Sequence, residues 1–166
     1  MVLRATSNRA LEAAVGIRAH PEDDRPGDSP LPAFLANGFR LAIQMAPTAR
    51  GAEEILEETA LARNFDLADG VVRSEAKVRF YRELLRSAER RAWLGPRASD
   101  LEPAPAGAAT LPLPPPIRAA VVLQTIEGFT YEQLACALGC DLETARDRLH
   151  RGRALVRERV RGEEAC

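Results

Sequence analysis

Apolar residues recur every three or four positions along much of the chain, which is the spacing of amphipathic helices. This pattern predicts helices over residues 33–44, 51–63 and 74–94, and a shorter amphipathic helix over residues 1–16. Strand-type alternation is hard to find, and Ala, Leu, Arg and Glu dominate the composition, which favours helices. The sequence therefore predicts an all-α protein.

A helix-turn-helix is predicted near the C-terminus, in the sequence TYEQLACALGCDLETARDRLHRGR. Thr130 and Gln133 have the spacing of a capping box at the start of its first helix. Gly139 is expected to end that helix, because glycine takes the left-handed conformation at little cost. Asp141 is expected to cap the second helix. The face of the second helix that should pack inward consists of Leu142, Ala145, Leu149, Gly152 and Val156.

The opposite face of this second helix is polar and basic. From Arg146 to Arg161 the chain carries seven arginines against two carboxylates, a net charge of +5. Such a face is suited to the major groove of DNA, with Arg146 near a base edge and Arg151 and Arg153 on phosphates. The alternative is a solvated amphipathic helix in an all-helical protein. The predicted DNA contacts are Glu143, Thr144, Arg146, Asp147, His150, Arg151 and Arg153.

Residues 111–160 resemble region 4 of bacterial sigma-70 family factors, especially the extracytoplasmic-function (ECF) group. The resemblance lies in the opening Leu-Pro, the helix IRAAVVLQTIEG, the segment FTYEQLACALGC and the run ETARDRLHR. It implies that this module reads the −35 promoter element and binds the polymerase flap. Asp147 departs from the family, where a small hydroxyl residue is common; it would repel phosphate but could accept from a cytosine amino group.

The helix predicted over residues 51–63 carries a second pattern of the same family. Region 2 of sigma-70 factors has Ala-Glu-Asp followed by Gln-Glu-Thr, and here AEE and EET stand at the same spacing. From the residues alone, a solvated charged helix is the alternative. The resemblance implies that the helix binds core RNA polymerase through Glu53, Glu54, Glu57 and Glu58.

The helix predicted over residues 74–94 corresponds, by the resemblance, to the part that melts promoters and reads the −10 element. Its aromatic residues Phe80, Tyr81 and Trp93 could stack on unpaired bases, which is worth roughly 1–3 kcal/mol per base. The family usually has a Trp-Leu-Tyr type run and an Asn, which Ser87 replaces here. The predicted −10 contacts are Arg79, Phe80, Tyr81, Arg86, Ser87 and Arg90.

Proline-rich segments divide the chain into predicted modules. Residues 1–32 form an N-terminal extension or linker, and residues 33–94 form a region 2-like helical domain. Residues 95–116, with seven prolines, are expected to be an extended tether. Residues 117–162 form the region 4-like domain. We expect two helical modules with few contacts between them, or with a contact that a partner rearranges.

Composition narrows the classes of function. The net charge is −1, so affinity for DNA must come from local segregation of charge. No phosphate loop or nucleophile motif is found, and Cys136, Cys140 and Cys166 lack zinc-ligand spacing, so we expect no enzyme, cofactor or metal. Cys136 is expected to pack as a small apolar residue. Without a signal sequence or apolar span, the protein is expected to be cytoplasmic, with no membrane insertion.

The resemblance therefore implies a transcription initiation factor whose partners are core RNA polymerase, promoter DNA and an anti-sigma factor. One alternative is a degenerate sigma-like mimic that sequesters an anti-sigma factor without initiating transcription, which the weak aromatic set and Asp147 would fit. A plain helix-turn-helix repressor is another alternative, but it has no need of the acidic pattern at residues 52–59.

Overall fold

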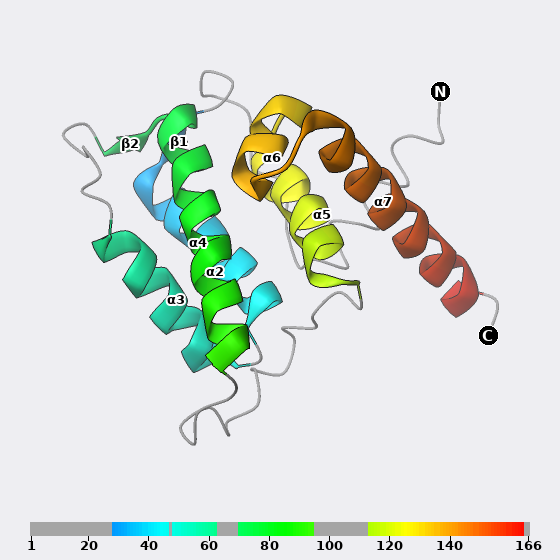
Figure 1. Cartoon of the computed structure of the whole chain (residues 1–166), viewed down its shortest axis with the longest axis horizontal. Coiled ribbons are helices and arrows are strands. Elements are labelled where there is room, and N and C mark those ends of the chain that lie inside the picture. Colours follow the sequence, from blue (N-terminus) through cyan, green and yellow to red (C-terminus); the bar gives the residue numbers. More distant parts are fainter. Residues whose placement is uncertain (1–27, 47, 63–69, 95–112, 165–166) are drawn as a thin grey trace.

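Six helices and one small sheet make up the part of the chain that the computed structural model describes, residues 28–46, 48–62, 70–94 and 113–164 (Figure 1). The first half holds α2 (Leu31–Met45), α3 (Ala49–Leu61) and α4 (Ser74–Leu94). The second half holds α5 (Pro115–Glu127), α6 (Tyr131–Leu138) and α7 (Leu142–Glu164). β1 (Ser29–Pro30) pairs antiparallel with β2 (Val71–Val72). The all-α prediction is confirmed.

Two predicted helix boundaries were wrong, and both errors involve proline. α2 begins at Leu31, so residues 29–32 form a strand and a first helical turn instead of a linker. Likewise α5 includes Pro115 and Pro116, which the prediction places in the tether. Proline is tolerated in the first turn because its missing N–H would have no acceptor there. The helix predicted over residues 1–16 and the tether over residues 95–112 lie outside the described residues.

The helix-turn-helix has the local geometry that its sequence predicts. The Thr130 hydroxyl accepts from the Gln133 backbone N–H at 3.3 Å, and the Gln133 side chain accepts from the Thr130 N–H at 2.9 Å. Gly139 ends α6 with φ of 63°. Asp141 accepts from the Thr144 backbone N–H at 2.7 Å and so caps α7. The capping box, the glycine stop and the second cap are therefore confirmed.

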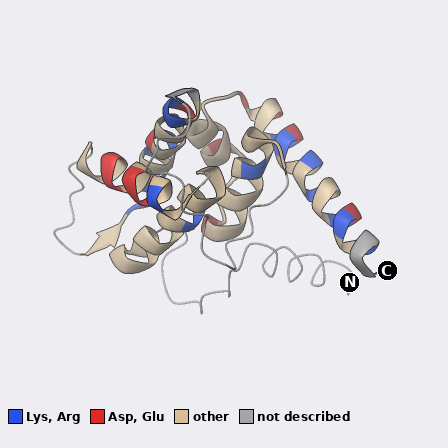
Figure 2. Ribbon diagram, turned by 90° about the horizontal axis from the view of Figure 1, so that it is seen from below, with Lys and Arg blue, Asp and Glu red and all other residues tan. Residues whose placement is uncertain are grey.

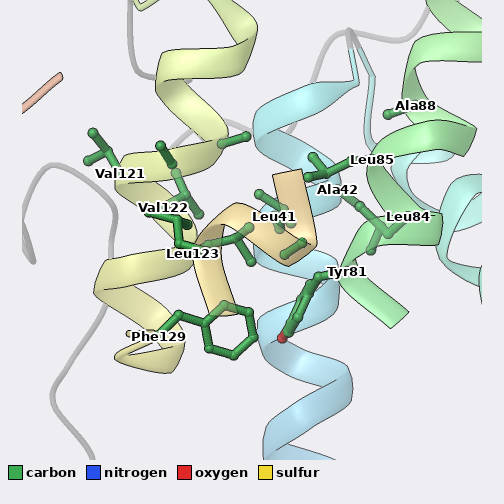
Figure 3. Close-up of a cluster of buried hydrophobic side chains, with 14 of the residues drawn as sticks. Leu41, Ala42, Tyr81, Leu84, Leu85, Ala88, Val121, Val122, Leu123 and Phe129 are labelled. Carbon is green, nitrogen blue, oxygen red and sulfur yellow. The ribbon is translucent and has the colours of Figure 1, made fainter. Parts of the chain in front are cut away.

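The two modules share one hydrophobic core, which corrects the expectation of few contacts between them. The other expectation, a contact that a partner rearranges, stays a prediction. Figure 3 shows side chains of α2, α4 and α5 in one cluster, with Phe129 facing Tyr81. Residues 119–123 of α5 are all buried. A helix that is apolar all round must be covered on more than one side. Accordingly α5 packs against α7 within its own module and against α2 of the other module.

Gly152 allows α7 to approach α5 closely, and we predict that Gly152→Ala destabilises the protein. A Cβ at this position would lie 2.3 Å from Val121 Cγ2 and 2.9 Å from Ile117 Cγ2. Overpacking should outweigh the helix propensity gained, for a net loss of about 1–2 kcal/mol in unfolding free energy. Urea denaturation measures this loss, and Ala154→Gly on the same helix calibrates the propensity. An increase in stability would show that the helices can separate at no cost.

Candidate DNA-reading and polymerase-binding surfaces

The basic face of α7 is presented to solvent. Figure 2 shows basic positions along α7, whose C-terminal half projects away from the other helices. Arg146, Asp147, His150 and Arg151 are exposed, as is Glu143. The inward face is largely as predicted, since Ala145, Leu149, Gly152 and Val156 are buried and Leu142 is half-buried. The helix therefore offers a charged surface of the kind that fits a DNA groove.

Tyr131, which the sequence analysis did not single out, holds two of the predicted DNA contacts. The guanidinium carbon of Arg146 lies 5.2 Å from the centre of the Tyr131 ring. The His150 ring stacks on the same ring, with centroids 6.4 Å apart and planes 23° from parallel. A cation over an aromatic face is attracted by the ring electrons. Tyr131 therefore orients Arg146 and His150 from the start of α6.

Other members of the predicted set are engaged within the protein. The Thr144 hydroxyl donates to Asp141 at 2.8 Å as part of the helix cap. The Thr144 backbone N–H, the strongest of the donors to Asp141, lowers the pKa of that carboxyl. Arg153 is half-buried and donates to the Gln124 side chain at 2.7 Å. Arg151 pairs with Asp147 at 3.5 Å. The structure thus separates Arg153, which is tied to α5, from the exposed Arg146.

The acidic face of α3 divides into two pairs. Glu53 and Glu57 are exposed. Glu54 instead forms ion pairs with Arg91 of α4 and with Arg50, and the hydrogen bond from Arg91 lowers the pKa of its carboxyl. These contacts mean that only part of the predicted acidic set projects freely from the helix.

Glu58 is exposed like Glu53 and Glu57, but it also contacts α4. The Ser87 hydroxyl donates to Glu58 at 2.8 Å and lowers the pKa of that carboxyl. Arg90 adds an ion pair at 3.1 Å. Glu58 therefore helps to join α3 to α4.

Three of the predicted −10 residues are buried in this structure. Phe80 and Tyr81 are 0% exposed and Ser87 is 1% exposed, so none of them can stack on a base or contact DNA here. Phe80 packs against Phe34 with ring centroids 4.7 Å apart, as part of the core of the first module. This corrects the expectation that these residues lie on the surface. Arg79, Arg86 and Arg90 are exposed, and the side chain of Trp93 lies outside the described ones.

A buried ion pair joins the two modules. Lys77 of α4 and Glu127 of α5 are 3.1 Å apart, with side chains 3% and 1% exposed. The other carboxylate oxygen of Glu127 accepts from Tyr81 at 2.5 Å and from Asn37 at 2.9 Å. Lys77 also donates to Ser29 at 2.5 Å. Burying two charges is unfavourable unless both are paired and hydrogen-bonded, and this cluster meets that condition only while the modules are in contact.

Two further contacts cross between the modules. Arg118 of α5 donates to the Gln44 carbonyl at the end of α2, at 2.5 Å, and to the Leu113 carbonyl at 2.8 Å. Burial lowers the pKa of Arg118. Gln133 of α6 donates to Ser74 at the start of α4, at 2.6 Å. The closed arrangement is therefore held by polar contacts at several points around the apolar core.

The two described cysteines differ in exposure. Cys136 is exposed, which corrects the expectation that it packs as an apolar residue. Cys140 is half-buried, and burial raises the pKa of its thiol.

Among the described helices, none combines the length and apolar character that a membrane crossing requires.

Comparison with known proteins supports the interpretation of the C-terminal module. Residues 110–156 match the family model of sigma-70, region 4. A stretch of 46 residues is 54% identical to the ECF RNA polymerase sigma factor SigE of Mycolicibacterium smegmatis. That stretch covers 28% of this chain and 18% of the relative. The C-terminal module is therefore similar to region 4 of the ECF sigma-70 factors, over a stretch that spans less than a fifth of the relative's length.

The fold of the chain is similar to that of a solved structure over a longer range. It is similar to the sigma factor RpoE from Bartonella quintana, solved in complex with the anti-sigma factor NepR. The TM-score is 0.50, with 22% identity over 79% of this chain and 91% of that one. The comparison covers more of the chain than the region 4 match, so the helices outside region 4 take part in the shared fold.

Proposed function

We propose that this chain is a transcription initiation factor that binds core RNA polymerase and directs it to −35 and −10 promoter elements. The observation that carries the proposal is the region 4 match, which falls on a helix-turn-helix with an exposed basic face. Promoter DNA and polymerase are the partners, and an anti-sigma factor is a further one, as in the complex of the similar RpoE. A protein acting with RNA polymerase would work in the cytoplasm and needs no chemistry of its own.

The closed arrangement would have to open for this function. Promoter elements named for positions −35 and −10 lie about 25 base pairs apart, or roughly 85 Å along the duplex at 3.4 Å per pair. A folded chain of this size has a radius of gyration of only about 15 Å. One closed molecule could not contact both elements. We infer that the modules separate when the factor binds polymerase and promoter.

Separation would also change which residues of α4 reach DNA. Tyr81 and Lys77 are covered partly by the second module, through Glu127 and through Phe129, whose ring centroid is 5.8 Å from that of Tyr81. Opening would expose Lys77 and one side of Tyr81, whereas Phe80 would stay packed on Phe34. Within the predicted −10 set, we therefore keep Tyr81 and the exposed arginines and set Phe80 aside.

Run-off transcription with core polymerase on a library of promoter templates tests the proposal. Transcripts with a defined start that depend on this protein are the expected result. Binding to polymerase without any transcript would overturn the proposal and favour the sigma-like mimic.

The exposed carboxylates of α3 give a separate prediction for polymerase binding. Glu53→Lys combined with Glu57→Lys should weaken binding to core polymerase at least tenfold, because complementary charge favours association with a basic partner surface. These two residues are chosen because Glu54 and Glu58 also hold α4. The matched control is Glu75→Lys combined with Glu132→Lys, which makes the same change of charge elsewhere on the exposed surface. Equal affinities of the two variants would remove α3 from the polymerase contact.

A further inference from the structure

A cavity of about 320 Å³ lies between the two modules. α4 contributes Arg82, Arg86 and Glu89 to its lining, and α7 contributes Arg148. The end of α2, the start of α5 and the end of α6 supply mostly apolar lining, such as Met45. The cavity therefore combines three guanidinium groups and one carboxylate with an apolar wall, at the place where the modules meet.

Two of these arginines lack an acceptor among the described residues. The Nε of Arg82 is buried and makes no hydrogen bond there. Arg148 is half-buried, and no hydrogen bond or ion pair between described residues uses its guanidinium. By contrast Arg86 is exposed and lies 3.9 Å from Glu83. A buried guanidinium donor without an acceptor is unfavourable. Within the described part of the chain, Arg82 and Arg148 therefore lack an anionic partner, even though Glu89 also lines the cavity.

The turn of the helix-turn-helix closes over Arg82. A Cβ on Gly139 would lie 3.9 Å from both the Nε and an Nη of Arg82. Arg82 therefore lies beside the turn between α6 and α7, and Arg148 reaches the same cavity from α7. A ligand held by Arg82 and Arg148 together would contact both modules at once.

We propose that this cavity binds a small molecule bearing a phosphate group. Arginine presents a planar fork of donors that matches phosphate oxygens, and two forks can share one dianion. The volume is at the lower end of the range for small-molecule pockets, so it has room for a compact organic part against the apolar wall. Because the ligand would bridge the modules, it binds the closed form and shifts the population toward it. If the open form binds promoters, as the function proposed above requires, the ligand inhibits promoter binding; this step rests on that proposed function.

Isothermal titration of the full chain with inorganic phosphate and with pyrophosphate, at constant ionic strength, tests the site. Arg82→Gln and Arg148→Gln should each weaken binding at least tenfold. The matched control is Arg79→Gln, an exposed arginine of the same helix that does not line the cavity, and it should change affinity less than twofold. Because Arg148 comes from the other module, its variant keeps the test valid if Arg82→Gln does not fold.

Small-angle X-ray scattering measures the radius of gyration, which a ligand bound elsewhere on the surface would not change. Pyrophosphate should lower the mean radius of gyration of the wild type and leave that of Arg148→Gln unchanged. Citrate, a carboxylate of comparable charge, shows whether the phosphate group itself is selected, and tighter binding of citrate would overturn the assignment of ligand class. No binding, or equal losses in all three arginine variants, would overturn the site. Neither measurement uses polymerase, so failure here leaves the transcription proposal intact.

Discussion

Glu127→Ala is expected to open the molecule. In the closed form this change would leave the Lys77 ammonium, now 3% exposed, without its carboxylate. Removing one partner of a buried ion pair typically costs about 3–5 kcal/mol. Separation of the modules would hydrate Lys77 and avoid the cost, so the population should shift toward the open form. Small-angle X-ray scattering should show a larger radius of gyration, and thermal unfolding should become less cooperative between the modules.

A double variant makes this prediction specific to the ion pair. Adding Lys77→Met to Glu127→Ala removes the unpaired charge and should restore much of the compactness that the single variant loses. Glu132→Ala, an exposed carboxylate in the same module, is the matched control and should leave the scattering unchanged. A Glu127→Ala variant as compact and stable as this control would show that the buried pair does not hold the modules together.

Local features were predictable because they depend on neighbours in sequence. The bounds of α4, the capping box of Thr130 and Gln133, and the left-handed turn at Gly139 all follow from interactions within a few residues. The starts of α2 and α5 differ from the prediction because both helices have proline in their first turn, where it is accepted, although proline breaks a helix further along.

Contacts between distant helices were not predictable in the same way, although the sequence held signals for some. Residues 119–123 are apolar without interruption, which indicates a helix covered on several sides. Lys77 is the one lysine of the chain, and nothing in its neighbourhood indicates that Glu127 is its partner. The exposed face of α7 followed from periodicity alone. The role of Tyr131 did not, because it depends on how α6 crosses α7.

Arg146→Ala is expected to weaken binding to the cognate −35 duplex by about 1–3 kcal/mol and to relax base preference at one position. Arg146 lies near the start of α7, where recognition helices contact base edges, and its guanidinium is exposed over the Tyr131 ring. Arg151→Ala should instead weaken all duplexes alike and reduce the salt slope by about 1. Arg151 is chosen for this comparison instead of Arg153, the other arginine predicted to contact phosphates. Arg153 also donates to Gln124, so removing the Arg153 side chain would disturb the packing of α5 on α7.

Variants of Tyr131 test whether base reading depends on the orientation of the Arg146 guanidinium as well as on its charge. Tyr131→Phe keeps the ring under Arg146 and beside His150 and should preserve discrimination between cognate and scrambled duplexes. Tyr131→Leu removes the ring and should reproduce part of the Arg146→Ala loss on the cognate duplex alone, because a guanidinium that is no longer held samples more conformations. Titrations of both duplexes at several salt concentrations measure these effects. Equal losses on both duplexes for Arg146→Ala would mean that α7 contacts the phosphate backbone without reading bases, and the −35 specificity would then have to reside elsewhere in the chain.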